Sequence, residues 1–357
     1  MGIAMLHYVF FIAFISFFTG VLAPNSATAA PLLTAYALSA AGDSAFGSLG
    51  PFSCSTFARD PRTGNIGGGF EVGLPTSGPC GVGVDSRLAS TTSGGVTVSS
   101  SLAVGFGTPS DLRAFVGGSA GRAGFGNLGV RANASYSGTT GSSTVLGAQA
   151  FGRQTEPMTF GGASGAGVFR PTFTIDGSFF NAGRTDSQLA FLYAVGSGPD
   201  LTAFRIQNNR GLLTYLDPSG FVPLFPGMSL TGDLVNGLTV AGLTTFTLNI
   251  PIIFGTATDI TYSLWAAALP SSSFGQLTPS AATIDFMNTA KLTGIDVLDS
   301  RGRSVSAFSI VAGSGTLYDR NGVVVNGGPG NGVPEPGSLP LMVMGLLGAA
   351  YAVRRRI

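Results

Sequence analysis

Runs in which apolar and polar residues alternate one by one are the feature that most limits what this chain can fold into. They occur at residues 172–176, 245–250 and 260–264, where Phe, Ile, Leu or Tyr alternates with Thr, Ser, Asn or Asp. Such alternation puts one kind of side chain on each face of an extended strand. An almost wholly apolar run at 189–195 indicates a buried strand. Strand signals at intervals of roughly ten to fifteen residues, with no helical period between them, favour a sandwich of antiparallel sheets.

The residue types agree with this interpretation. Lys, one of the residues that favour helices, occurs only once, as Lys291, whereas the chain has 55 Gly and 20 Pro. Low charge and much glycine also occur in disordered chains. However, 44% of the residues are hydrophobic and 27 are Phe, which is enough apolar surface for a buried core. We therefore predict a mostly β protein with an antiparallel β-sandwich-like body.

The body is expected at residues 30–326, with a change of character inside it. Residues 30–155 are rich in Gly and Ser, whereas residues 156–326 carry the stronger strand signals, so one domain or two remain open. Small alternating residues at 91–150 suit narrow strands, and a Gly/Ser linker is the alternative there. Turns that begin with Asp and end with Gly are expected at 217–220, 299–302 and 319–322.

Residues 1–29 have the organisation of a secretory signal peptide. An apolar run is followed by Ala27 and Ala29, small residues at the two positions that signal peptidase recognises. Cleavage would leave Ala30 or Pro31 as the first residue. No Lys or Arg precedes the apolar run, so a retained N-terminal anchor is the alternative.

The only two cysteines, Cys54 and Cys80, both lie in the part expected to be exported. Disulfides persist outside the cytoplasm. A bridge between them would close a loop of about 27 residues and stabilise the protein by roughly 3–4 kcal/mol on the chain-entropy model. Two free buried thiols are the alternative.

The C-terminal end combines a rigid spacer, an apolar segment and a basic stop. The Gly/Pro linker 327–338 contains Pro334, Glu335 and Pro336, and its prolines keep the backbone extended. The apolar stretch of segment 339–357 spans about 22 Å as a helix, which is short of the roughly 20 residues that a lasting transmembrane helix needs.

Three arginines, Arg354, Arg355 and Arg356, follow the apolar stretch. Each costs roughly 2.5–3.5 kcal/mol to insert in a membrane, so they are expected to stay in the cytoplasm with the body outside. The tail is therefore interpreted as a processing signal, with an ordinary single-pass transmembrane anchor as the alternative.

These residues resemble the PEP-CTERM sorting signal of Gram-negative bacteria that produce exopolysaccharide. Pro334, Glu335 and Pro336 match the motif, and the three arginines match its basic end. The resemblance implies cleavage near the motif by exosortase, a membrane protease, after a transient insertion in the inner membrane. A looser resemblance to the bodies of such proteins, which look like secreted β-sandwiches, covers 284–297 and 314–318. It implies an Asn-Thr-Ala turn followed by a Gly-Thr-x-Tyr strand.

The sequence excludes several kinds of site. The one His is His7, in the signal peptide, which removes Ser-His-Asp machinery and His-ligated zinc from the mature body. The G-x-S-x-G pattern at 117–121 lacks both a His base and a strand–turn–helix context. The whole chain has 18 Lys+Arg and 17 Asp+Glu, so it offers no basic surface for nucleic acid. We expect no cofactor and no metal, with Ca²⁺ as an alternative whose ligands are unknown.

Two other candidate sites remain in the body. Carboxylates that a hydrolase could pair are Asp176, Asp186, Asp285, Asp296 and Asp299. The single Trp, Trp265, shares a strand face with Thr261 and Ser263; it could stack on a sugar if that face is wet, or pack under a loop.

From these observations we expect a non-enzymatic, exported protein of the outer surface or extracellular matrix. Its expected role is structural or adhesive, in association with exopolysaccharide. A carbohydrate-binding module and a surface glycoside hydrolase are the alternatives.

Overall fold

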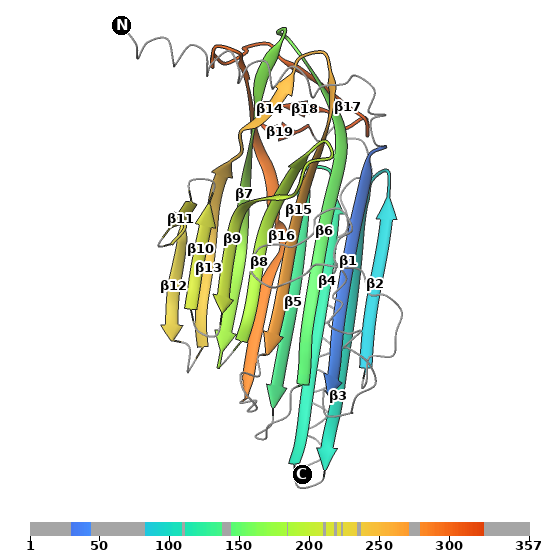
Figure 1. The fold of residues 1–357 in the computed structure, drawn as a ribbon, viewed down its shortest axis with the longest axis vertical. Coiled ribbons are helices and arrows are strands. Elements are labelled where there is room, and N and C mark those ends of the chain that lie inside the picture. The colour runs from blue at the N-terminus through green and yellow to red at the C-terminus, as the bar shows by residue number, and fades with distance from the viewer. Residues whose placement is uncertain are drawn as a thin grey trace, which may run out of the picture.

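A computed structural model of the protein describes ten stretches of the chain. They are residues 30–43, 83–108, 111–137, 144–183, 185–209, 212–217, 220–222, 224–233, 237–270 and 279–324. These residues form two antiparallel sheets that pack face to face, and no helix is found among them (Figure 1). The prediction of a mostly β, sandwich-like body is confirmed for this part of the chain.

Sheet A has nine strands in the order β11-β10-β9-β8-β15-β6-β1-β2, with β17 paired to β6. Its strands are β1 Leu32–Asp43, β2 Gly83–Thr91, β6 Thr144–Gly161, β8 Thr185–Val195, β9 Leu201–Asn209, β10 Leu212–Asp217, β11 Gly220–Val222, β15 Ala257–Pro270 and β17 Ser309–Ala312.

Sheet B has eight strands in the order β12-β13-β7-β16-β5-β4-β3, with β14 paired to β7. Its strands are β3 Gly95–Thr108, β4 Asp111–Gly124, β5 Asn127–Ser137, β7 Ala166–Ala182, β12 Met228–Asp233, β13 Gly237–Thr247, β14 Ile250–Ile253 and β16 Ser280–Asp299. A small hairpin, β18 Tyr318–Asp319 and β19 Gly322–Val323, completes the described strands.

Aromatic rings fill one side of the core between the two sheets. Phe173 on β7 packs 4.7 Å from Phe191 on β8 and 4.8 Å from Tyr262 on β15, measured between ring centroids. Phe173 and Tyr262 come from alternating runs and Phe191 from the apolar run at 189–195, and all three rings are buried. Because an aromatic side chain buries a large apolar area, this side carries most of the hydrophobic stabilisation.

Many small residues line the other side of the core, where β1 and β6 pack against β4 and β5 around a few large side chains such as Phe115 and Leu128. A Cβ atom added at Gly121 on β4 would lie 2.5 Å from the carbonyl oxygen of Tyr36 on β1. The two backbones therefore approach too closely for any side chain larger than hydrogen. Residues 95–137 form three strands here, so the Gly/Ser linker alternative is wrong for them.

Strands from both halves of the body contribute to both sheets. The boundary expected near residue 155 falls inside β6, and one hydrophobic core contains Leu33 of the first half together with Phe173 of the second. The Gly/Ser-rich and the aromatic halves are therefore the two sides of one sandwich in the described residues.

One expected turn is wrong and two are confirmed in the described residues. Asn288 and its neighbours, expected as a turn, lie within β16, where the register shifts between Phe286 and Ala290 and marks an irregularity in a continuous strand. The turn at 319–322 joins paired strands, and the turn at 299–302 ends β16. Asp217 pairs with Gly220, but the two residues between them lie outside the described residues.

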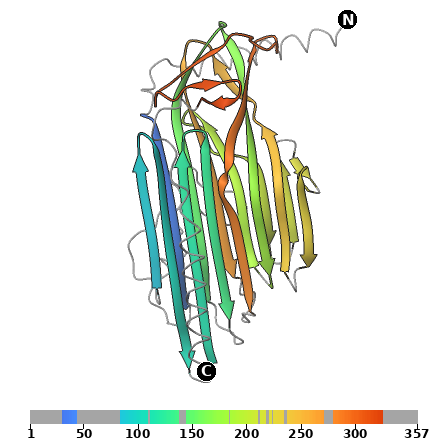
Figure 2. The same cartoon turned by 180° about the vertical axis from the view of Figure 1, so that it is seen from behind.

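Strand connections alternate between two ends of the sandwich. Strands β14, β17, β18 and β19 gather at one end, which we call the cap end (Figures 1 and 2). The described chain enters sheet A near this end at Leu32 and finishes at it with residue Val324. At the opposite end, the connections 44–82, 109–110, 138–143 and 271–278 lie outside the described residues.

Candidate functional site

The segment that precedes the sorting tail folds back onto the cap end of the body. We call residues 309–324 the C-terminal cap; it contains β17, β18 and β19. Strand β17 pairs with the end of β6, so the cap begins as a short extra strand of sheet A. The expected Gly-Thr-x-Tyr strand is mostly irregular here, since only its Tyr318 lies in a strand.

The cap is attached to sheet A through a buried carboxylate, Glu156 on β6. The Tyr318 hydroxyl donates to Glu156 Oε2 at 2.5 Å, and the Ser314 hydroxyl donates to Oε1. The Ser314 N–H donates to Oε1 at 3.3 Å, and Gln154 Nε2 approaches Oε2 at 3.5 Å. A buried carboxylate needs such donors because its removal from water is costly.

The local sequence explains why Glu156 is buried. Gln154, Glu156, Met158 and Phe160 are alternate residues of one strand and are all buried. Gln154 also accepts a hydrogen bond from the Gly126 N–H at 2.7 Å, which ties the cluster to the β4–β5 turn. An acidic residue at an alternate position of the same strand as a buried Met and Phe was therefore the sequence signal that could have revealed this site.

Burial raises the pKa of Glu156, and the donors Ser314, Tyr318 and Gln154 offset part of that rise. Tyr262 lies next to the cluster, and its pKa is raised well above the ordinary value first by burial and then by the charge of Glu156. Among the described residues no cation neutralises Glu156, so hydroxyl and amide donors carry its stabilisation.

A second set of contacts attaches the cap to sheet B. The Ile295 N–H on β16 donates to the Arg320 carbonyl at 2.9 Å. The Arg320 guanidinium donates to the Val305 carbonyl at 2.9 Å, and its Cζ lies 5.4 Å from the centroid of the Phe308 ring. The cap thus joins β6 of one sheet to β16 of the other and closes this end of the sandwich.

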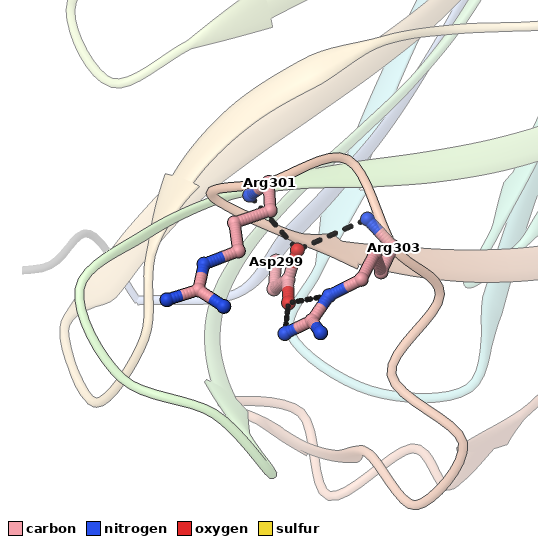
Figure 3. Close-up of polar contacts among 3 residues, drawn as sticks. All are labelled: Asp299, Arg301 and Arg303. Carbon is pink, nitrogen blue, oxygen red and sulfur yellow. Dashed lines mark hydrogen bonds and ion pairs between the residues drawn. The ribbon is translucent and has the colours of Figure 1, made fainter.

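The loop after β16 is held by Asp299 (Figure 3). Its Oδ1 accepts the backbone N–H groups of Arg301 at 2.9 Å and Arg303 at 3.0 Å, and its Oδ2 accepts Arg303 Nη2 at 2.8 Å. The backbone N–H of Arg303, followed by its side chain, lowers the pKa of Asp299. This arrangement is a closed turn, and its carboxylate is already used by the chain itself.

Three of the carboxylates considered for hydrolysis already bind partners within the described residues, Asp299 in the turn above and two others as follows. Asp285 binds Arg131 at 2.7 Å, and Asp296 accepts the Ser304 hydroxyl at 2.6 Å. Asp176 is exposed on β7, and the side chain of Asp186 is outside the described set. The described residues contain no group of three or more His, Cys, Asp or Glu that could hold a metal ion.

Trp265 is fully buried, on the face of sheet A that points away from the main core. As its alternation predicted, it lies on the face opposite Tyr262. A second apolar cluster surrounds it, made of Tyr36, Leu38, Phe151, Ala190, Leu192 and Ala267. In this conformation neither face of the indole is open to a sugar, so stacking would require the cluster to open.

The remaining sites from the sequence lie outside the described residues. They are the signal-peptidase positions Ala27 and Ala29, the cysteines Cys54 and Cys80, the motif Pro334, Glu335 and Pro336, and the arginines Arg354, Arg355 and Arg356. In the stretches that the structure does describe, no helix has the length and apolar character to cross a membrane.

Comparison with protein families identifies the tail. Residues 332–356 match the model of the PEP-CTERM protein-sorting motif. The chain is thus an exported protein that is sorted by way of the membrane. Its C-terminal end carries a PEP-CTERM sorting signal, a motif that implies processing by an exosortase-type protease. No curated protein and no solved structure matches the chain.

Proposed function

We propose that this protein is a structural or adhesive component of the outer surface or extracellular matrix, delivered by cleavage of its C-terminal signal. The PEP-CTERM match at 332–356 is the observation that carries the proposal. It follows the body closely, since only residues 325–331 separate it from the cap. Residues 325–338, which lead from the cap to the apolar segment, span no more than about 50 Å when fully extended.

The body supports a non-catalytic role through the state of its polar groups. Asp285 and Asp299 form ion pairs with arginines, and the buried Glu156 is bound by donors from the cap. A carboxylate that acts as a general acid or base must reach a substrate. Association with exopolysaccharide is part of the proposal, and the hydroxyl-rich strands of the body offer hydrogen-bonding groups for it.

The experiment that tests delivery replaces Pro334, Glu335 and Pro336 with Ala in the full chain. The variant is expected to accumulate as an uncut, membrane-held precursor, whereas the wild type appears outside the cell without its tail. Pro329→Ala, in the same linker but outside the matched motif, is the control and should be processed normally.

Mass spectrometry of the C-terminal peptide of the extracellular protein gives the readout. Residues 339–357 still attached to the extracellular wild-type protein would refute the processing proposal in favour of a lasting anchor. The matrix role is tested separately, by sedimentation of the processed protein with polysaccharide from the same cells. Recovery of all the protein in the supernatant would contradict that role.

A further inference from the structure

Among the strands that the structure describes, β3 forms a long edge of sheet B, and its own sequence lacks the features that normally protect an edge strand. It has fourteen residues, Gly95–Thr108, none of them charged and none Pro. Among the described strands it pairs only with β4, in an unbroken register from Gly95 to Thr108 that contains no bulge. Soluble proteins usually blunt edges with charges, Pro, bulges or short strands. The other end strands of the two sheets, β2, β11 and β12, are shorter, with 9, 3 and 6 residues.

One contact shows which backbone groups of β3 face the free edge. The Ser101 N–H donates to Asp85 Oδ2 on β2 at 2.9 Å, so it is not used in pairing with β4. Backbone groups along a strand point alternately to its two sides. The N–H and C=O groups of Thr97, Ser99 and Ala103 therefore share the free edge with those of Ser101. The side chains of these four residues are all exposed.

We propose that the β3 edge is a homodimer interface, in which β3 pairs antiparallel with β3 of a second copy of this chain about a two-fold axis. Such an isologous contact would continue sheet B through both molecules. Asp85 protects one backbone group of this edge, because it accepts the Ser101 N–H near the middle of the strand. The proposal does not depend on the matrix function.

The residues of β3 favour a second copy over other partner strands. An uncharged strand can face itself without repulsion, and a copy of β3 matches the full length of the edge. Antiparallel pairing of two such strands would place Thr97, Ser99 and Ser101 across from small or hydroxyl side chains. The molecule already uses such pairs, since the hydroxyls of Thr155 and Thr261 lie 3.0 Å apart across β6 and β15. Hydroxyl pairs across strands stabilise sheets.

The test compares charges added at the edge with charges added inside the same sheet. The dissociation constant is measured on the full chain in a mild detergent, by size-exclusion chromatography with light scattering over a range of concentrations. S99K/A103K adds two like charges to each of the paired strands, so the dimer is expected to weaken by roughly fivefold or more. S135K/S137K adds the same charge at two exposed positions of the interior strand β5 and should leave the dissociation constant unchanged.

A third variant tests whether Asp85 limits pairing at this edge. Asp85→Ala frees the Ser101 N–H in each copy, so the dimer is expected to tighten by roughly fivefold to a hundredfold, as two added backbone hydrogen bonds predict. Fluorescence of Trp265 checks that each variant is folded.

Hydrogen exchange supplies a readout that needs no substitution. Exchange in peptide 95–108 should slow as the wild-type concentration rises, while exchange in peptide 228–233, at the other edge of sheet B, stays constant. Four results would each overturn the proposal: a monomer at every concentration up to the solubility limit, a dimer that survives S99K/A103K, equal weakening by S135K/S137K, or protection of both edges, which would indicate head-to-tail filaments.

Discussion

Replacing Tyr318 with Phe tests whether the C-terminal cap is held by a charge-assisted hydrogen bond. The substitution removes one hydroxyl and leaves the ring, whose side chain is buried against the core. Glu156 Oε2 then loses the hydroxyl donor that lies 2.5 Å away, and the remaining donor near this oxygen is Gln154 Nε2 at 3.5 Å. The effect on stability should therefore depend on whether Glu156 is ionised.

The expected magnitude follows from the two protonation states of Glu156. A hydrogen bond to an ionised group contributes about 1.5–3 kcal/mol, and one between neutral groups about 0.5–1.5 kcal/mol. Because burial raises the pKa of Glu156 above its ordinary value of 4.5, its carboxyl is neutral in acid and ionises only at a higher pH. Tyr318→Phe should thus cost about 0.5–1.5 kcal/mol near pH 4 and about 1.5–3 kcal/mol near pH 9.

The wild-type protein should show the matching pH dependence. A carboxyl whose folded pKa is raised contributes stability that is fully present below the unfolded pKa and is lost as the pH rises through the folded pKa. The Tyr318 bond lowers the pKa of Glu156, so its removal raises that pKa further. The variant should therefore lose more stability than the wild type as the pH increases.

Urea unfolding followed by Trp265 fluorescence measures both effects, since the chain has one Trp. Tyr215→Phe is the matched control: the Tyr215 hydroxyl is buried and finds no hydrogen-bond partner in the described structure. Its removal should be neutral or slightly stabilising at either pH. A cost for Tyr318→Phe that is equal at both pH values, or larger in acid, would refute the charge-assisted bond.

Three further predictions concern the body and its processing. Gly121→Val should destabilise the body by about 1–3 kcal/mol or more, because the added Cβ meets backbone atoms that cannot rotate away. Gly124→Val is the control, since its Cβ would have ordinary contacts. Equal unfolding midpoints for the two variants would contradict the close approach of the sheets. Cys54 and Cys80 should resist a thiol reagent in the unfolded, non-reduced mature protein and react after reduction; labelling of both before reduction would exclude the bridge. N-terminal sequencing of the extracellular protein should begin at Ala30 or Pro31, and recovery of peptides from residues 1–20 would indicate a retained anchor.

Local alternation in the sequence was enough to find the strands and their buried faces. Phe173 and Tyr262, from alternating runs, face the core, because a one-residue shift would expose the large side chains of their strands. Phe191 is buried in the strand that the apolar run at 189–195 predicted. Alternation also placed Trp265 on the face opposite Tyr262. It could not show what covers that face, because period-two patterns give the side of a strand and not its neighbours.

The attachment of the cap was beyond such local patterns. Glu156 and Tyr318 are 162 residues apart, and no pattern in either segment indicates that the two residues are in contact. The irregular region of β16 near Asn288 was mistaken for a turn for a related reason. Its residues favour a turn by themselves, but pairing with β5 and β7 on both sides keeps the strand continuous.

The two-sided attachment of the cap has a mechanical consequence. Any pull on the tail, by the membrane or by a bound protease, enters the body at Val324. It passes through Tyr318 to β6 and through Arg320 to β16, which are both interior strands of their sheets. The load is thus shared between the two sheets instead of peeling an edge strand from one of them. A force on the last residues must therefore break the contacts of the cap with both sheets before it can unfold the body from its C-terminal end.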